Sequence, residues 1–322
     1  MIKSEKSDQI SIEFFIDWAC KMHFPGIMWE TQLAVLSQMT TSFRLKDFLD
    51  LHAIDLLGIP QKDWLPIVEN PKLRKWLSMH PNWQNEANDV IERSISRGFE
   101  IYHPAHHKYP TEFYRLSNPP ISLFVSGRIS NLKKLSVVGS REPRPESIEW
   151  MERYLGEVVK EGVSLVSGAA RGVDQAAHRI SLREKTPTVA FLPSGLNRVY
   201  PTDFLRWHGD IVHDGGALVS EYLPDIEMQR SHFEARNRLI AALSPLTLVV
   251  ESRRRSGTLI TARHALQVGR EVATISQSPL YMKGWGGLDL LFDGAHLIRD
   301  ADDLRDLLSR CQNSISSASS IK

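Results

Sequence analysis

The sequence predicts an α/β protein, in which a small all-helical N-terminal domain precedes a Rossmann-like, doubly wound and mostly parallel sheet. From residue 135 onward, short runs rich in β-branched residues alternate with amphipathic helical stretches. These runs are continuously apolar, which is typical of strands covered by helices on both faces of a parallel sheet. Before residue 97, apolar residues instead recur at helical spacing, without alternating strands.

The length of 322 residues exceeds what a single core usually organises, so more than one domain is expected. The tryptophans of the N-terminal part are expected to fill a helical core. A connector rich in proline, aromatic and turn residues follows and is expected to be irregular with short strands. We predict a helical domain at 1–97, the connector at 98–134, the Rossmann-like domain at 135–308 and a disordered Ser-rich tail at 309–322.

The order of strands and helices supports this fold class. Six strands are predicted at 135–140, 163–168, 188–194, 216–222, 246–252 and 271–276. Four helices are predicted between them, at 145–162, 173–185, 233–243 and 258–270. The first helix carries a continuous apolar stripe that includes Met151, Leu155 and Val158. Strands and helices that alternate in this way indicate a parallel sheet with helices on both faces.

Composition excludes several classes of protein. The formal net charge is +1 with acids and bases evenly mixed, so any nucleic-acid site has to be a local patch. Cys20 and Cys311 lack metal or redox spacing, and His103, His106 and His107 lie in a Pro-rich loop without a nearby acid, so no metal is expected. The polar N-terminus and the lack of a long apolar run predict a cytoplasmic protein that binds no membrane.

Small, hydroxyl and guanidinium side chains recur directly after the predicted strands. In doubly wound sheets, ligands bind beyond the carboxyl ends of the strands, where helix N-termini offer free N–H groups. Any one such turn is explained as a tight connection, but four that converge on one edge favour an anionic or phosphate ligand. The residues concerned are Gly139, Ser140, Arg141, Ser167, Gly168, Arg171, Gly195, Ser256, Gly257 and Thr258.

Further arginines support this interpretation, because the planar guanidinium forms two parallel hydrogen bonds to phosphate. Arg236 and Asn237 lie on a short helix and could reach the sheet edge. Arg254 and Arg255 end a run of three arginines before Thr258, which we expect to cap the next helix. These three arginines either bind backbone phosphates of a nucleic acid or lie in a solvated loop where their charge has no binding role.

Asp174 and His178 share a helix face with Arg171, at spacings i, i+3 and i+7. They form either a relay in which Asp174 orients His178 or Arg171, or a structural network at the helix N-terminus. No nucleophile elbow accompanies them, so we predict no catalytic residue. The chain also lacks G-x-G-x-x-G after the first strand and lacks a P-loop, so no cofactor is expected.

A series of separated motifs covers about two thirds of the chain: Gly139–Arg141, Ser167–His178, Ser194–Pro201, Ser220–Tyr222, Phe233–Ser244, Val249–Arg270 and Gly286–Ile298. In these motifs the sequence resembles the DNA processing protein A (DprA/Smf) family. The resemblance implies a dimeric, non-catalytic protein that binds and protects single-stranded DNA and helps to load a RecA-type recombinase. It also implies that Arg141 contacts a backbone phosphate.

The chain departs from the family pattern in one loop especially. Thr202, Asp203 and Phe204 stand where relatives often have a basic residue and an asparagine, and Arg198 could restore the lost charge. We expect no C-terminal winged-helix domain of the kind that many members carry. These differences fit a specialised relative that acts in DNA uptake, recombination or a related defence process.

Two alternatives remain open at this stage. The same strand-edge pocket could sense a small nucleotide or, less plausibly, hydrolyse one, as related phosphoribohydrolases do. Those enzymes resemble this chain at Ser256–Thr258 but place glutamates after it, whereas Leu259 and Ile260 follow here. The helical N-terminal domain could instead be the working part, docking a protein partner while the sheet serves as its scaffold.

Overall fold

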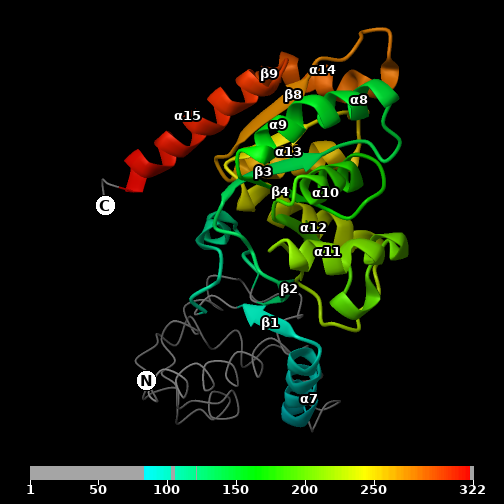
Figure 1. Ribbon diagram of the computed structural model, residues 1–322, viewed down its shortest axis with the longest axis vertical. Coiled ribbons are helices and arrows are strands. Elements are labelled where there is room, and N and C mark those ends of the chain that lie inside the picture. The colour runs from blue at the N-terminus through cyan, green and yellow to red at the C-terminus, as the bar shows by residue number, and fades with distance from the viewer. Residues whose placement is uncertain (1–82, 103–105, 121, 320–322) are drawn as a thin grey trace, which may run out of the picture. The chain divides into compact units, whose positions relative to one another are not determined.

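The computed structural model describes residues 83–102, 106–120 and 122–319 (Figure 1). The chain divides into two units, of which the second contains Pro110–Leu116 and everything from Phe124 onward. Most of the predicted helical domain, 1–97, lies outside the described ranges. Among the described residues of the first unit are helix α7, Trp83–Ser96, and strand β1, Phe99–Tyr102.

The predicted connector, 98–134, is divided between the two units. Its segment Pro110–Leu116 belongs to the second unit and contains a short 3₁₀ helix, Thr111–Arg115. This assignment has a packing reason, because Phe113 is fully buried with its ring 6.2 Å from that of Phe191 in an edge-to-face contact. The segment is therefore held by the core of the second unit.

The second unit contains the predicted Rossmann-like sheet, in the strand order β2-β6-β5-β4-β3-β7-β8-β9. β2 pairs with β6 in antiparallel orientation, and the remaining pairs are parallel. The predicted doubly wound, mostly parallel sheet is thus confirmed. The strands are β2 Leu123–Gly127, β3 Lys133–Val138, β4 Val163–Ser167, β5 Thr188–Phe191, β6 Ala217–Ser220, β7 Leu246–Val249, β8 Glu271–Ile275 and β9 His296–Ile298.

Helices cover both faces of this sheet, because its central strands β4, β5, β6 and β7 are buried along their whole length. Val137 of β3 faces a buried core to which Ile180 of α10 and Leu304 of α15 contribute. On the other face, the Ser136 hydroxyl donates a hydrogen bond of 2.6 Å to the Ile240 carbonyl of α12. The helices are α8 Pro145–Trp150, α9 Gly156–Lys160, α10 Val173–Arg183, α11 His208–His213, α12 Arg230–Leu243, α13 Gly257–Gln267, α14 Trp285–Phe292 and α15 Ala301–Ser319.

The predicted helix at 145–162 is confirmed, but a π-helical turn, Met151–Leu155, interrupts it between α8 and α9. The predicted disordered tail at 309–322 is wrong as far as Ser319, because α15 continues through it. The physical reason is visible in the packing of this helix. Leu304, Leu308 and Cys311 follow helical spacing and are buried in the core, so the helix extends into the Ser-rich stretch.

The order of the strands determines where a ligand can bind. From β3 the chain proceeds outward through β4, β5 and β6, then returns to β7 on the other side of β3 and continues to β8 and β9. The direction of winding therefore reverses between β3 and β7. In doubly wound folds, such a switch point opens a crevice at the carboxyl ends of the strands. None of the described helices is long and apolar enough to cross a bilayer.

Candidate nucleic-acid interface

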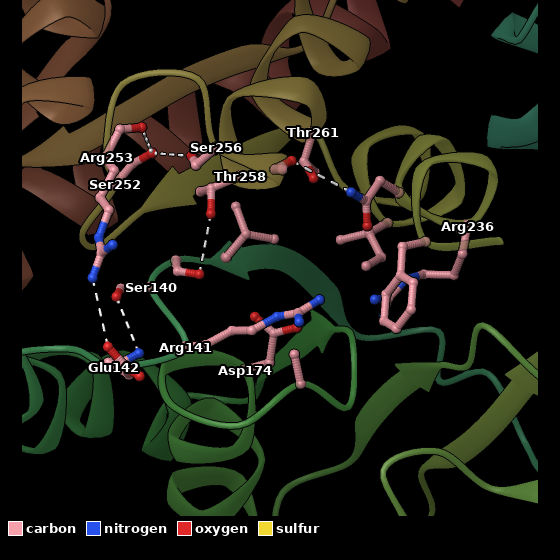
Figure 2. Close-up of a pocket in the computed structure, with 17 residues that line it drawn as sticks. Ser140, Arg141, Glu142, Asp174, Arg236, Ser252, Arg253, Ser256, Thr258 and Thr261 are labelled. Carbon is pink, nitrogen blue, oxygen red and sulfur yellow. Dashed lines mark hydrogen bonds and ion pairs between the residues drawn. The ribbon is translucent and has the colours of Figure 1, made fainter. Parts of the chain in front are cut away.

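A cavity of about 380 Å³ lies at this switch point, between the loop that follows β3 and the start of α13 (Figure 2). A second cavity of about 490 Å³ continues from it toward the loop around Tyr200. Arg141, Phe233 and Arg236 line both cavities, so the two form one elongated depression, which we call the groove. Its length exceeds what a single phosphate group requires.

The loop after β3 holds Arg141 at the junction of the two cavities. Within this loop, the Glu142 amide donates to the Ser140 hydroxyl at 3.1 Å. The next turn is anchored by the buried Glu251, which accepts a hydrogen bond of 3.0 Å from the Arg144 amide. The Arg141 guanidinium lies 5.1 Å from the centre of the Phe233 ring, and no carboxylate in the described part of the chain forms an ion pair with it. An exposed guanidinium supported by an aromatic face can accept a phosphate without first losing an acidic partner.

The N-terminus of α13 supplies the opposite wall of the first cavity. The helix begins at Gly257, so its N-cap is Ser256 and the predicted cap at Thr258 is wrong. The Thr258 hydroxyl instead donates to the Gly139 carbonyl at 3.1 Å, which ties α13 to the end of β3. The Ser256 hydroxyl is engaged with Ser252 at 2.7 Å and caps no amide of the helix. The Leu259 amide donates to the Ser256 carbonyl at 3.1 Å, so the amides of this first turn that are available to an anion in the cavity are those of Gly257 and Thr258.

A buried pair, Arg236 and Asp174, forms the floor of the groove. Arg236 is 4% exposed and donates a hydrogen bond of 2.7 Å to the Phe191 carbonyl at the end of β5, while its Nε has no hydrogen-bond partner. Gly168 makes this arrangement possible. A side chain at that position would overlap the Arg236 guanidinium and press on the Asp174 carboxylate.

Burial shifts the titration of both partners. Loss of solvent raises the pKa of Asp174 to about 6, although the neighbouring positive charge of Arg236 opposes the shift. Loss of solvent also lowers the pKa of Arg236 to about 10, against the attraction of Asp174. At neutral pH the floor therefore carries two opposite charges that attract each other, and this attraction compensates their desolvation only in part.

Of the two alternatives for Asp174 and His178, the structure contradicts the relay and favours a structural network, because the two side chains face different partners. His178 is fully buried, with Nε2 2.6 Å from the Gly168 carbonyl and Nδ1 2.8 Å from the Thr188 hydroxyl. Since a carbonyl can only accept, Nε2 carries the hydrogen of the neutral ring, and the Thr188 hydroxyl beside Nδ1 donates its own hydrogen to the Leu165 carbonyl at 2.8 Å. Burial lowers the pKa of His178 to about 4, so it remains neutral at pH 7 and supports the turn after β4 structurally.

The three consecutive arginines of the β7–α13 loop point in different directions. Arg253, which we did not select from the sequence, lines the first cavity and forms an ion pair of 3.5 Å with Glu142 across it (Figure 2). Arg254 turns away to bind Asp289 through two hydrogen bonds of 2.6 and 2.7 Å. Arg255 is exposed outside both cavities and has a positive φ of 58°.

The second cavity contains the loop in which the chain departs from the family pattern. Arg171 lines this cavity and forms an ion pair of 3.2 Å with Asp203, one of the divergent residues. Phe204 is fully buried, with its ring 5.1 Å from the His178 ring in an edge-to-face contact. Arg198 is exposed but lies outside both cavities, so it does not replace a groove cation in this structure.

The structure brings most of the predicted site residues together, but not all of them. Ser167, Gly168, Gly195 and His178 lie beside or beneath the groove and not on its surface. Residues that line the groove but were not selected from the sequence include Glu142, Tyr200, Phe233 and Arg253. The predicted residues that line it are Gly139, Ser140, Arg141, Arg171, Asp174, Arg236, Asn237, Ser256, Gly257 and Thr258.

In the described residues, no group of three His, Cys, Asp or Glu side chains is close enough to hold a metal ion. His103 lies outside the described ranges. The ring of His106 stacks on that of Tyr102 at 5.0 Å and on that of His107 at 4.6 Å.

The fold and the groove define a Rossmann-like protein with an arginine-lined crevice at the switch point of its sheet. The chain belongs to the DNA recombination-mediator protein A family, whose model matches residues 100–309. Protein Smf of Escherichia coli K12 is 36% identical over 203 residues, which cover 62% of this chain and 54% of the relative. The DNA processing protein DprA of Streptococcus pneumoniae R6 is 35% identical over 198 residues, which cover 61% and 70%. The matched region thus spans about half the length of the Smf relative.

Two solved structures share the fold. The X-ray structure of DprA from Streptococcus pneumoniae superposes with a TM-score of 0.70 at 25% identity, covering 92% of this chain and 97% of that one. DNA processing protein A from Helicobacter pylori, studied for its single-stranded DNA binding mode, gives a TM-score of 0.57 at 27% identity and covers 66% and 97%.

The buried floor of the groove predicts a specific pH dependence of stability. The folded-state pKa of Asp174 is raised to about 6 from an ordinary 3.8. Its contribution to the free energy of unfolding is therefore greatest below about pH 4 and is lost as the pH rises through 6. Relative to Asp174→Asn, the wild-type protein should lose about 3 kcal/mol of unfolding free energy between pH 4 and pH 7. Urea unfolding at a series of pH values measures this difference.

His178 titrates with the opposite sign, since its depressed pKa destabilises the fold as the pH falls from 6.5 toward 4. That contribution is common to both proteins and cancels in the comparison. A difference between wild type and Asp174→Asn that stays constant with pH would contradict the buried, desolvated carboxylate.

Proposed function

We propose that the groove binds single-stranded DNA and performs no chemistry on it. The protein would protect the strand and present it to a RecA-type recombinase in DNA uptake, recombination or a related defence process. The observation that carries this proposal is the placement of Arg141 and the open N-terminus of α13 on facing walls of one groove. The family description and the binding mode studied in the Helicobacter relative support it.

The shape of the groove favours a strand over a single nucleotide. Two cavities follow one another, and each offers a cation, Arg141 at their junction and Arg171 further along. Phe233 and Tyr200 line the second cavity, with their rings 5.9 Å apart, and provide flat apolar surface against which bases can stack. Phosphate contacts combined with aromatic stacking are the usual means of binding single strands without reading their sequence.

The proposal requires no catalytic residue. The carboxylates that line the first cavity already have partners, Asp174 beside Arg236 and Glu142 in an ion pair with Arg253. The first cavity alone, at about 380 Å³, is large enough for a mononucleotide, which keeps a nucleotide sensor as the second candidate. Competition between a mononucleotide and an oligonucleotide distinguishes the two functions.

Substitution of Arg141 tests the proposed function directly. Arg141→Ala should weaken binding of a labelled oligothymidylate at least about tenfold, and should reduce the slope of log affinity against log salt by about 0.7, because one phosphate contact is lost. Fluorescence anisotropy over a series of salt concentrations measures both quantities. Arg153→Ala is the matched control, because it removes an exposed arginine from the π-helical turn between α8 and α9, outside the groove.

Equal affinity of Arg141→Ala and wild type for the oligonucleotide would contradict the proposal. Displacement of the strand by thymidine monophosphate at micromolar concentration would favour the nucleotide sensor instead.

The ion pair between Arg171 and Asp203 predicts a gain of affinity on neutralisation. Asp203 competes with phosphate for Arg171 and adds negative charge to the groove. Asp203→Asn should therefore bind the same oligonucleotide on the order of threefold more tightly and with a steeper salt dependence. Glu227→Gln removes an exposed carboxylate outside both cavities and should leave affinity unchanged. Weaker or unaltered binding by Asp203→Asn would show that this pair lies off the path of the strand.

We further propose that the protein forms a homodimer through the edge of the sheet at β9. This strand ends the sheet, so its outer backbone groups are open to pairing. Phe292 of α14 is 93% exposed and Leu297 of β9 is 44% exposed, an apolar surface that a second copy of the chain would cover.

Replacement of Phe292 by glutamate should shift the protein from dimer to monomer in sedimentation velocity at micromolar concentration. Leu205→Glu, which changes another exposed apolar residue, in the segment Thr202–Trp207, should leave the dimer intact. A monomeric wild type, or a dimer unaffected by Phe292→Glu, contradicts this mode of association.

A further inference from the structure

Another polar cavity, of about 450 Å³ and separate from the two that form the groove, lies at the opposite edge of the sheet. Lys133 begins β3, Pro245 precedes β7 and Arg270 precedes β8, so the cavity is formed at the amino-terminal ends of the strands. Thr111–Arg115 closes it from the side. It shares no lining residue with the groove. We refer to it as the amino-edge cavity.

The charge of the amino-edge cavity is strongly one-sided. Four cationic side chains line it, Arg115, Lys133, Lys134 and Arg270, against the single carboxylate of Glu112. Glu112 approaches Lys134 to 3.9 Å, at the limit of an ion pair. Cations gathered in a concave site repel one another and concentrate a positive potential there, which an incoming anion relieves.

Arg270 is the buried member of this cluster. It is 5% exposed, its Nη2 donates to the Ala242 carbonyl at 3.1 Å, and its Nε is buried without a hydrogen-bond partner. Burial lowers the pKa of Arg270, and the positive charge of Arg115 lowers it further. A buried guanidinium with an unused donor and a second arginine nearby is unfavourable unless an anion completes the site.

A purely structural role explains only part of this arrangement. Arg270 follows α13 and contacts a carbonyl near the C-terminus of α12, a position where cations stabilise helix ends. That role accounts for one N–H group of Arg270. It gives no reason for Lys133 and Arg115, both exposed, to line the same cavity.

From this geometry we propose that the amino-edge cavity is a second anion site, which takes a phosphate group carried by a nucleotide or by a nucleic-acid strand. Phosphate offers several acceptor oxygens and up to two negative charges. Its oxygens can accept hydrogen bonds from the N–H groups of one guanidinium, and its charge is neutralised by neighbouring lysine ammonium groups. The cavity is larger than one phosphate ion, so the phosphate can bring an attached nucleoside with it. The site goes beyond the proposed groove function and does not depend on it.

Isothermal titration with sodium pyrophosphate tests the proposal on the full-length protein. Wild type should bind two equivalents, and Arg115→Ala/Lys133→Ala should remove one of them or weaken it at least tenfold. Both residues are exposed, so this variant should keep the fold, which a thermal melt verifies. Arg153→Ala/Lys160→Ala removes the same number of exposed cations from the helix face and is the control.

Loss of the other equivalent in Arg141→Ala reports on the groove alone, so failure of the groove function and failure of this site remain distinguishable. A titration of Arg115→Ala/Lys133→Ala that superimposes on wild type overturns the amino-edge site. So does an equal loss of binding in the control variant, which would indicate general screening by surface charge.

Competition in the Arg141→Ala background identifies the source of the phosphate. Displacement of pyrophosphate by thymidine monophosphate alone assigns the site to a free nucleotide. Displacement by oligothymidylate, with or without a 5′-phosphate, assigns it to a strand. Displacement by none of these probes restricts the cavity to small inorganic ions and overturns the proposal.

Discussion

The burial of Arg236 is the constraint on which the geometry of the groove depends. Its guanidinium lies beneath the switch point, bonded to the end of β5 through the Phe191 carbonyl and placed beside Asp174 of α10. The turn after β4 passes so close that Gly168 cannot be replaced without displacing it. One side chain from α12 thus connects the ends of neighbouring strands, and the groove takes its floor from that connection.

The cations of the groove differ in how strongly they are already engaged. Arg253 and Arg171 are each held by a nearby acid, whereas Arg141 rests on the Phe233 ring. Exposed ion pairs contribute little to stability. A phosphate can therefore replace Glu142 as the partner of Arg253, or Asp203 as the partner of Arg171, at a small cost in free energy. This pairing explains how a chain with a net charge of +1 can present a site for a polyanion. On the proposed function, the resident acids would moderate the attraction for DNA, and the divergent loop would tune the affinity of the groove without abolishing it.

The sequence was sufficient for strands β3 to β8, because continuously apolar strands between amphipathic helices admit few other arrangements. The short edge strand β9 was not predicted, since two of its three residues are exposed. The sequence also identified most of the groove, since the carboxyl ends of parallel strands necessarily meet at one edge. It could not tell which of three adjacent arginines faces the cavity, because that depends on Asp289 drawing Arg254 away and leaving Arg253 inside. Nor could it show that Thr258 bonds to β3 rather than capping α13, or that Asp174 pairs with Arg236, 62 residues further along. These outcomes are set by tertiary contacts that local spacing does not encode.

A crystal structure of the protein with a short oligothymidylate tests the central claim most directly. The account predicts one backbone phosphate within hydrogen-bond distance of the Gly257 and Thr258 amides and of the Arg141 guanidinium. A base of the same strand should lie against Phe233 in the second cavity. A strand bound away from the switch point, with the first turn of α13 still facing solvent, would contradict it.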